Sequence, residues 1–457
     1  MTSRRSTPLS RRHFLRGTAA AALYAPFVSS RSWAAASPNG KIQVATFGAG
    51  GQGAGDLESL VRHEKFQLVA VADVDRRALD ALKAKYATEF PDLRVYRDWR
   101  DLLAKEGDKL DACHVATPDH MHAPIGLAAM KMGKHLYGQK PLTQNLWENR
   151  QMILRAREKS VKTQMGIQVS SDFTERFAVE MVHSGIIGKV KEVHTFSEKD
   201  WGDLTPVPDR KDTPPDWLNW DHWLGVAEDR AFIEGYYHPG NWRKRRDFGT
   251  GTLGDMGCHI FSSWFRALGL TTPTAVKSTG TAPANLTNWA INGQVEYTFP
   301  ATKFTAGDSV KVTWYDGNRR PPAEVIALIE ADAGPRQIKV PGQGNIIIGT
   351  EGVLLHPHGG RPELFPQEKF KGFKYPKLEP RDHYHEWLDA IIAGGTTQPS
   401  ANFDYAGPLT ESVLLGCLAS VFPGEELKWN SENLKFTNSE AATKLVKRTY
   451  RPGWEIA

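Results

Sequence analysis

The sequence predicts an α/β protein with two folded units, a doubly wound parallel sheet followed by a largely antiparallel sheet packed on helices. From Lys41 to about Lys162, short apolar segments alternate with amphipathic helical patterns, as in sheets with helical crossovers. A glycine-rich sequence, Gly48-Ala49-Gly50-Gly51-Gln52-Gly53, joins the first apolar segment to a helical pattern. After Gln168, apolar segments recur without helices between them, which is typical of antiparallel sheets.

In the first unit, each apolar segment has the length of one strand, and each helical pattern keeps its apolar residues on one face. The strands are predicted at Ile42–Phe47, Phe66–Ala72, Arg94–Tyr96, Asp111–Thr117, His135–Tyr137 and Thr163–Ile167. The helices are predicted at Arg76–Tyr86, Ala123–Met132 and Leu146–Lys159.

The second unit begins with a predicted helix, Thr174–Ser184, and a strand, Val190–Phe196, followed by a proline-rich excursion from Pro206 to Pro215. Further strands are predicted at Ala275–Ser278, Gln294–Phe299, Lys311–Tyr315 and Ile346–Leu355. Two late helices, His383–Ala393 and Pro408–Phe422, complete the unit.

The N-terminus has the pattern of a twin-arginine export signal. Arg11-Arg12 precede Phe14-Leu15, a modest apolar stretch follows, and Ala34-Ala35-Ala36 is a small-residue cleavage site. The alternative is a disordered basic terminus. We therefore expect a signal peptide at residues 1–36, a dinucleotide-binding domain at 37–162, and a substrate and oligomerisation domain at 163–457. The mature protein would be periplasmic, without a membrane anchor.

Composition argues against several partners. The net charge of +5 over 457 residues includes six arginines of the signal, which contains no acid, so the mature chain is close to neutral. Attraction to nucleic acid or to a membrane surface therefore has no support. The three cysteines are widely spaced and indicate neither a disulfide framework nor a metal cluster. Several of the 14 tryptophans gather between Trp201 and Trp264, where they suit either sugar stacking or a core.

The glycine-rich sequence follows a strand and opens a helix, the context that a dinucleotide fingerprint requires. Gly48 would allow the tight turn, Gly50 the approach of a pyrophosphate, and Gly53 close packing of the helix. Asp73 ends the second strand, where a carboxylate would bind the ribose hydroxyls and favour NAD. Arg76 and Arg77 follow and could accommodate the extra phosphate of NADP. The alternative is a glycine-rich turn in an unrelated α/β protein.

Three further segments carry candidate chemistry. The loop Thr117-Pro118-Asp119-His120-Met121-His122 follows the fourth strand, where a nicotinamide ring would lie, unless it is a proline turn with solvated histidines. Lys140 follows the fifth strand and could stabilise charge on a substrate oxygen, unless it is simply solvated. Asp255 and His259 would share one helix face. Asp255 could orient His259 as a general base, or the pair could serve packing alone.

Together these segments resemble the glucose–fructose oxidoreductase/inositol dehydrogenase family (Gfo/Idh/MocA) from Lys41 to the C-terminus. The resemblance rests on the fingerprint, the Thr117–His122 loop, Lys140-Pro141 and the Asp255…His259 pair. An exported branch of the family is indicated by further segments, namely Gln164-Met165-Gly166, Leu218–Gly225, Tyr237–Arg243 and Asn402–Leu409.

The resemblance implies an N-terminal Rossmann domain, a C-terminal α/β domain with a large open sheet that mediates dimers or tetramers, and a sugar or polyol substrate between them. It implies that Lys140 binds the reacting hydroxyl, His259 takes its proton, and Asp255 orients the base or substrate. The implied cofactor-binding residues are Gly48, Gly50, Gly51, Gln52, Gly53, Asp73, Thr117, Pro118, His122, Gln139 and Lys140. The implied substrate-binding residues are Gln168, Tyr237, His238, Trp242 and Arg243. No metal is expected.

Three features depart from the family pattern. Ile167, Val169 and Ser170 stand where polar residues are expected after Met165-Gly166. Gln139 stands where the family commonly has Glu, which removes a charge beside Lys140. Ser263 stands where many members carry an acid one helical turn after the histidine.

Three functions remain open from the sequence. The first is a periplasmic sugar oxidoreductase whose tightly bound NAD, or NADP, is recycled internally, because export leaves the cytoplasmic nicotinamide pool behind. The second is a glycosidase or lyase that oxidises a sugar transiently, eliminates the aglycone and returns the hydride, with His259 and Tyr237 or His238 as acid–base groups. The third is a non-catalytic sugar-binding protein.

Overall fold

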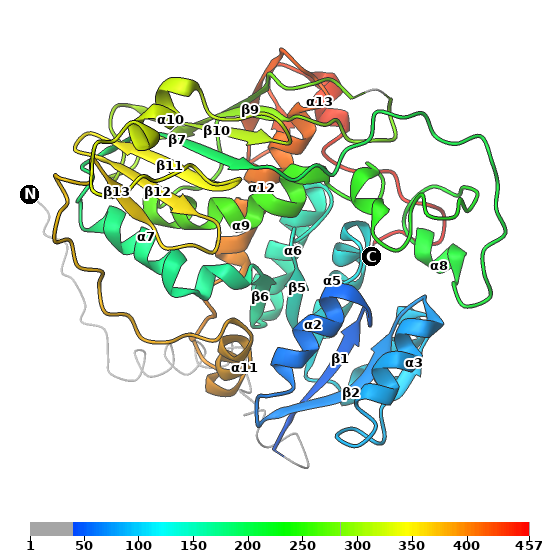
Figure 1. The fold of residues 1–457 in the computed structure, drawn as a ribbon. Helices are drawn as coiled ribbons and strands as arrows, with labels where there is room; N and C mark the ends of the chain where they lie inside the picture. Colours follow the sequence, from blue (N-terminus) through cyan, green and yellow to red (C-terminus); the bar gives the residue numbers. More distant parts are fainter. Residues whose placement is uncertain (1–39, 284, 457) are drawn as a thin grey trace, which may run out of the picture.

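The computed structural model describes residues 40–283 and 285–456, so the predicted signal at 1–36 lies outside the described residues. Figure 1 shows a parallel sheet in the lower half of the molecule and a larger sheet in the upper half. The predicted α/β fold, a Rossmann-like parallel unit followed by a mostly antiparallel one, is confirmed. Among the described residues, no helix has both the length and the apolar character needed to cross a bilayer.

The first sheet has six parallel strands in the order β3-β2-β1-β4-β5-β6. The strands are β1 Ile42–Phe47, β2 Phe66–Ala72, β3 Arg94–Tyr96, β4 Ala112–Val115, β5 His135–Gln139 and β6 Thr163–Gly166. The connecting helices are α2 Gly51–Leu60, α3 Arg76–Lys85, α4 Trp99–Glu106, α5 His122–Lys131 and α6 Leu146–Lys159. The order reverses between β1 and β4, which places a crevice at their carboxyl ends. Strand β6 pairs with β5 in this sheet, although it lies beyond residue 162, where the dinucleotide-binding domain was predicted to end.

The second sheet has nine strands in the order β13-β12-β11-β7-β10-β9-β8-β14-β15. The strands are β7 Val190–Ser197, β8 Ala275–Ser278, β9 Gln294–Pro300, β10 Ser309–Asp316, β11 Gln343–Gly349, β12 Val353–Pro357, β13 Glu363–Phe365, β14 Glu426–Asn430 and β15 Lys435–Phe436. Only β7 and β10 pair in parallel. Helix α9 Gly251–Leu268 packs against both α7 Phe173–His183 and α12 Phe403–Ala419, and α9 and α12 contact the sheet.

Two expectations for this sheet were wrong. The apolar run Ile346–Leu355 is a hairpin and not one strand: its ends, Ile346 and Leu355, pair across β11 and β12. The turn at Thr350–Gly352 reverses the chain inside a run that hydropathy alone reads as continuous. A helix, α10 Ala323–Glu330, also lies between strands β10 and β11, where no helix was expected.

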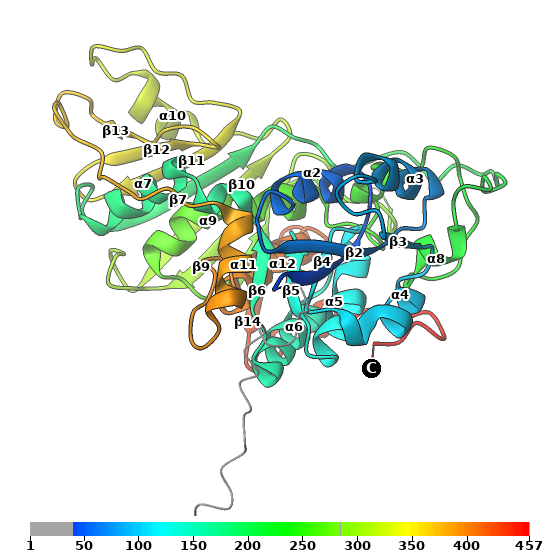
Figure 2. The same cartoon turned by 90° about the horizontal axis from the view of Figure 1, so that it is seen from below.

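Helix α11, His383–Ala393, was predicted with its observed bounds, but its location was not. It contacts α2 of the first unit. Trp387, Leu388 and Ile391 share a buried cluster with Tyr137 of β5. Figure 2 shows α11 beside α2 and the edge of the parallel sheet. The two units therefore share part of one core.

A long segment of the second unit crosses over the first. We define residues 217–244 as the strap; it includes α8, Trp220–Leu224, and a short 3-10 helix, η5, at Asn241–Lys244. Leu218 forms an isolated bridge with Asp75, and the Asn219 N–H donates to the Val74 carbonyl at 3.0 Å. Figure 2 shows α8 next to α3 and α4.

Candidate active site

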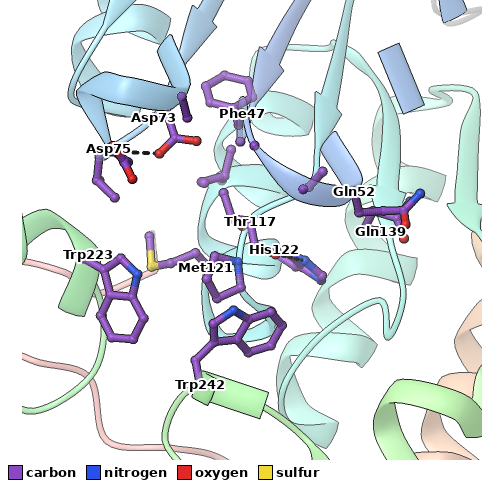
Figure 3. A pocket seen from close by; sticks show the side chains of 18 of the residues that line it. Phe47, Gln52, Asp73, Asp75, Thr117, Met121, His122, Gln139, Trp223 and Trp242 are labelled. Atoms are coloured by element: carbon purple, nitrogen blue, oxygen red, sulfur yellow. Dashed lines mark hydrogen bonds between the residues drawn. The ribbon is translucent and has the colours of Figure 1, made fainter. Parts of the chain in front are cut away.

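A cavity lies between the carboxyl ends of the parallel strands and the strap (Figure 3). One wall is formed by the glycine loop, the end of β2, the loop after β4, Gln139 at the end of β5, and Lys140 after it. The strap forms the opposite wall with residues that include Trp223, Trp242 and Arg243, and α9 adds Asp255. In Figure 3, Asp73 and Asp75 lie at one end of the cavity. The cavity thus combines the predicted cofactor and substrate regions.

The glycine loop has the shape that a dinucleotide requires. Gly48 has a φ of 98°, and a Cβ there would lie 2.5 Å from the Ala116 carbonyl oxygen. A Cβ on Gly53 would overlap the Gly48 carbonyl, so Gly53 allows α2 to pack against the turn. Gly50 caps α2 without a side chain, and no acid occupies the first turn. The first N–H groups of the helix are therefore available to a phosphate. Gly48, Gly50, Gly51 and Gln52 line the cavity, whereas Gly53 supports the turn from behind.

Two carboxylates mark the end of β2. Asp73 accepts hydrogen bonds from the N–H groups of Ala49, at 2.7 Å, and Asp75, at 2.9 Å. Burial raises the pKa of Asp73 despite these bonds. Asp75, which sequence reasoning missed, caps α3 and forms an ion pair with Arg77 at 2.8 Å. Arg77 also stacks over the Trp217 ring, so one of the two arginines proposed for the NADP phosphate is already engaged.

The loop after β4 forms the floor of the cavity. Thr117, Pro118 and His122 line it. The His122 ring nitrogens face two carbonyl oxygens, of Pro141 at 2.8 Å and Thr117 at 2.7 Å, and burial lowers the pKa of His122 to about 4. His122 is therefore neutral at pH 7 and joins this loop to the segment after β5. The alternative of solvated histidines in this loop is wrong, because His122 and His120 are both buried.

Gln139 is held by a buried carboxylate, Asp56 of α2. Asp56 accepts hydrogen bonds from Gln139 at 2.6 Å and Gln52 at 2.8 Å, and lies 3.0 Å from the His114 ring. Burial opposes ionisation of Asp56, but these partners outweigh burial and lower its pKa. A Glu at position 139 would place a second carboxylate next to Asp56, and the two would repel each other. The amide of Gln139 avoids this repulsion and donates to Asp56 instead. Gln168 also approaches Asp56, at 3.4 Å, and lies outside the cavity lining, so its predicted substrate contact stays a prediction.

Lys140 and Asp255 meet at the other end of the cavity. The Lys140 ammonium donates to Asp255 Oδ1 at 2.8 Å and to its main-chain oxygen at 2.7 Å. Arg243 Nε donates to Oδ1 at 3.2 Å, and the Trp201 indole donates to Oδ2 at 2.8 Å. Lys199 lies 3.9 Å from Oδ2. Burial opposes ionisation, but Lys140 and Arg243 outweigh it and hold the pKa of Asp255 far below its usual range.

His259 does not pair with Asp255 as expected. It lies one turn further along α9, outside the cavity lining, and its buried Nδ1 has no hydrogen-bond partner among the described residues. The Asp255 carboxylate is instead occupied by cations and an indole. The His259 ring lies 5.9 Å from the ring of His358, between centroids. Burial lowers the pKa of His259 well below its ordinary value, so its imidazole is neutral at pH 7.

The remaining substrate candidates separate into two groups. Trp242 and Arg243 line the cavity near Asp255. Tyr237 is buried among aromatic rings, including Trp223 and Phe248, and does not line it. His238 lines the opposite end, where its Nε2 lies 3.2 Å from Asp75. Tyr237 thus lies behind the cavity wall, and His238 lies at the nucleotide end; their predicted substrate contacts stay predictions.

Sequence reasoning missed three residues near the Lys140–Asp255 end, namely Lys199, Trp201 and His358. Lys199 and Trp201 follow β7, and His358 follows β12. No motif in the sequence marks them. The described residues also contain no group of three or more His, Cys, Asp or Glu side chains placed to hold a metal ion.

Comparison with known proteins identifies the class of the first unit. Residues 42–167 match the model of GFO_IDH_MocA, described as an oxidoreductase family with an NAD-binding Rossmann fold. This segment therefore has a Rossmann fold and is similar to the NAD-binding domains of that family.

Two curated relatives are similar to parts of the chain. A glycosyl hydrolase family 109 protein of a Shewanella species is 27% identical over 154 residues, 33% of each chain. Levoglucosan dehydrogenase of Pseudarthrobacter phenanthrenivorans is 23% identical over 190 residues, 42% of this chain and 40% of that one. The matches thus cover between a third and about two fifths of these relatives' lengths.

Solved structures share the fold over most of the chain. Levoglucosan dehydrogenase in complex with NADH and L-sorbose has a TM-score of 0.58 at 16% identity, covering 85% of this chain and 98% of that one. The aldose-aldose oxidoreductase of Caulobacter crescentus, complexed with glycerol, has a TM-score of 0.56 at 16% identity, covering 85% and 100%. At these identities the likeness establishes the fold alone.

Proposed function

We propose that the chain is a periplasmic oxidoreductase that acts on a hydroxyl of a sugar or polyol and uses a tightly held NAD recycled in place. One observation carries the proposal: a single cavity has a dinucleotide-binding loop along one wall and a buried Lys140–Asp255 pair at one end. Hydride transfer requires a nicotinamide site and a polarised hydroxyl next to each other, and this cavity offers both.

NAD suits the nucleotide end better than NADP. Asp73 and Asp75 place two carboxylates there, and the guanidinium of Arg77 is paired with Asp75. A ribose with free hydroxyls can donate to carboxylates, whereas a 2′-phosphate would be repelled.

At the other end the chain's own residues handle the substrate oxygen and its proton. NAD, when bound, supplies the hydride acceptor. Lys140 has three N–H donors, of which two are directed to Asp255, so one remains for the substrate oxygen, where it stabilises negative charge. We assign the hydroxyl proton to His259, one helical turn after Asp255, because its imidazole is neutral at pH 7 and its ring makes no hydrogen bond to another described residue.

The strap supports tight retention of the dinucleotide. Trp217 stacks on Arg77, Leu218 bridges Asp75, and the His238 ring lies 3.2 Å from Asp75. Arg451 also holds α8 in place, because its guanidinium donates to the Asp221 carboxylate of α8 at 2.7 Å. A dinucleotide in the cavity would have to break several of these contacts in order to leave.

Export and retention together favour a closed redox cycle. The export signal rests on the sequence pattern of residues 1–36, and a periplasmic enzyme has no pool of free NAD. The hydride taken from one sugar must therefore return to a second sugar or to a product of the first. We also predict that the protein is a homo-oligomer, either a dimer or a tetramer. Light scattering of the purified protein would measure its size.

The test is to purify the mature protein from periplasm without added nucleotide, denature it, and identify the released cofactor by mass spectrometry. We expect one NAD per chain. A protein that is empty and does not bind added NAD would refute the proposal. His259→Ala should keep the NAD and lose turnover by about 10²–10⁴-fold, the usual contribution of a general base. Undiminished turnover in that variant would remove His259 from its role.

A second candidate is hydrolysis of a glycoside through transient oxidation. The specific observation is His358, whose ring lies beside that of His259, so that two imidazoles are available where elimination needs a base and then an acid. The 27% identical relative named as a glycosyl hydrolase supports this alternative. Release of an aglycone from a glycoside without net reduction of NAD would favour it over simple dehydrogenation.

A further inference from the structure

Positive charge is concentrated at the substrate end of the cavity. Lys140, Arg243 and Lys199 surround the single carboxylate of Asp255, at 2.8, 3.2 and 3.9 Å. A second carboxylate, Asp119, interacts electrostatically with Lys140 and Arg243, but it is buried and accepts a hydrogen bond from Thr250 at 2.7 Å. Even with both carboxylates ionised, these five groups sum to a net positive charge.

Several donors of this cluster are unused. Arg243 bonds Asp255 through Nε, and its two terminal nitrogens have no acceptor in the part of the chain that the structure describes. Within the described residues, the Lys199 ammonium makes only the long contact to Asp255, and its side chain is 45% exposed. A guanidinium with two free terminal nitrogens matches the two oxygens of a carboxylate or sulfate.

The dinucleotide does not account for these cations. Its phosphates belong at the N-terminus of α2, which supplies N–H groups and the positive end of the helix dipole. The cations instead come from the segments after β5 and β7 and from η5 of the strap. The three cations also exceed what Asp255 requires, since one cation is enough to neutralise one carboxylate. The nucleotide end instead presents two carboxylates, Asp73 and Asp75, of which Asp75 is paired with Arg77.

Aromatic faces adjoin the cluster. The Arg243 guanidinium lies 4.3 Å from the Trp242 ring centroid and 5.5 Å from that of Trp201. Indole rings stack on the apolar faces of sugars, so this end combines a sugar-binding surface with an anion-binding fork.

We propose that the substrate is an anionic sugar, whose carboxylate or sulfate is bound by Arg243 and Lys199 while Lys140 binds the reacting hydroxyl. This inference rests on the proposed function and names its substrate class. A uronic acid and a sulfated sugar share the required chemistry, and the experiment separates them.

The experiment titrates the NAD-containing protein, as purified, with matched sugars and follows tryptophan fluorescence. The pairs are glucose and glucuronate, galactose and galacturonate, and N-acetylglucosamine and its 6-sulfate. We expect an anionic member to bind about tenfold or more tightly than its neutral partner, and salt at about 0.5 M to weaken that preference. A preference limited to the uronates or to the sulfate identifies the anion.

Two variants assign the preference to the cluster. Arg243→Gln and Lys199→Gln should each reduce the ratio of anionic to neutral affinity by about tenfold, while retained NAD shows that the variant is folded. Lys191→Gln is the matched control: it removes the same charge from the exposed part of β7, and the ratio should not change. Equal or tighter binding of the neutral members, or no binding of any sugar, overturns the inference. The proposed function fails separately, when NAD is absent or neutral and anionic sugars alike are not oxidised.

Discussion

Asp255 illustrates how a side chain takes its role from neighbours that are distant in sequence. The sequence pairs it with His259, four residues away, because both lie on one helix face. In the structure, Lys140 and Arg243 approach from other elements and occupy its oxygens. Asp255 therefore positions a lysine, and His259 is left with a free ring nitrogen among the described residues. The separation of these two tasks suits a site that must hold a cation and accept a proton.

Asp119 gives a pH-dependent prediction at the residue scale. Burial raises its pKa to about 7, against an ordinary value of 3.8. The folded state therefore binds a proton that the unfolded state has released, and stability from this group declines as pH rises from about 4 to 7. Asp119→Asn removes the titration and still accepts the bond from Thr250.

Relative to wild type, the variant's free energy of unfolding should thus rise by about 1.4 kcal/mol per pH unit over that range and then stay level. Urea unfolding of both proteins at several pH values measures this difference. A difference that is constant from pH 4 to 8 would show that Asp119 does not titrate there.

At the residue scale, the site residues that could be predicted from the sequence are those that belong to a motif. Lys140 and Asp255 were recognised by their patterns, and they meet in the structure. Lys199, Trp201 and His358 were missed because they follow strands of the second sheet, whose pairing no local pattern specifies. Asp75 did leave a signal, as a second acid two residues after Asp73 at a strand end. The burial of Tyr237 and the place of His238 beside Asp75 could not be predicted, because the path of the strap depends on its contacts with the first unit.

The glycine loop shows a single element in which backbone shape decides function. Gly48 combines a φ of 98° with contact to the Ala116 carbonyl, so any side chain there must displace either the turn or β4. Gly48→Ala should therefore abolish co-purification of NAD, measured by mass spectrometry.

Gly133→Ala is the matched control. Gly133 has a φ of 75° and open space around its Cβ position, so the substitution should cost about 1–2 kcal/mol of backbone strain and leave NAD bound. Loss of NAD from both variants would attribute the effect to general destabilisation.

Elements with strong local signals were predicted well. Helix α6 has its predicted bounds, with Asn145 as cap and left-handed Ser160 at its end. The parallel strands were recognisable because burial on both faces makes them continuously apolar. The same continuous apolar character caused the wrong prediction at β11 and β12, because two apolar strands joined by a short turn resemble one long strand. Helix α10 was missed because it lies in a region where the alternation of strands dominates.

At the scale of the whole molecule, the two units are joined through α11. Trp387 is fully buried in a cluster with Tyr137 of the parallel sheet. Trp387→Ala should therefore cost about 3–5 kcal/mol and loosen the NAD-binding unit, although residue 387 lies far along the chain. Urea unfolding followed by tryptophan fluorescence, with the NAD content of each preparation, measures both effects.

Leu154→Ala is the control for this prediction. Leu154 is 48% exposed on α6, so its truncation should change the unfolding free energy by less than about 0.5 kcal/mol. Unfolding of Trp387→Ala in two separate transitions, with NAD still bound after the first, would contradict a shared core.

The path of α11 also bears on how such proteins can be recombined. A chimera that joins residues 42–167 to the second half of a relative would leave the surface around Tyr137 facing a foreign helix. Strand β6 raises the same difficulty, since the Met165 N–H donates to the Ala401 carbonyl at 2.9 Å. The nucleotide-binding half is therefore not a transplantable module. Exchange of substrate specificity between such proteins should succeed through replacement of the strap and strand ends, with residues 383–403 kept native to the first half.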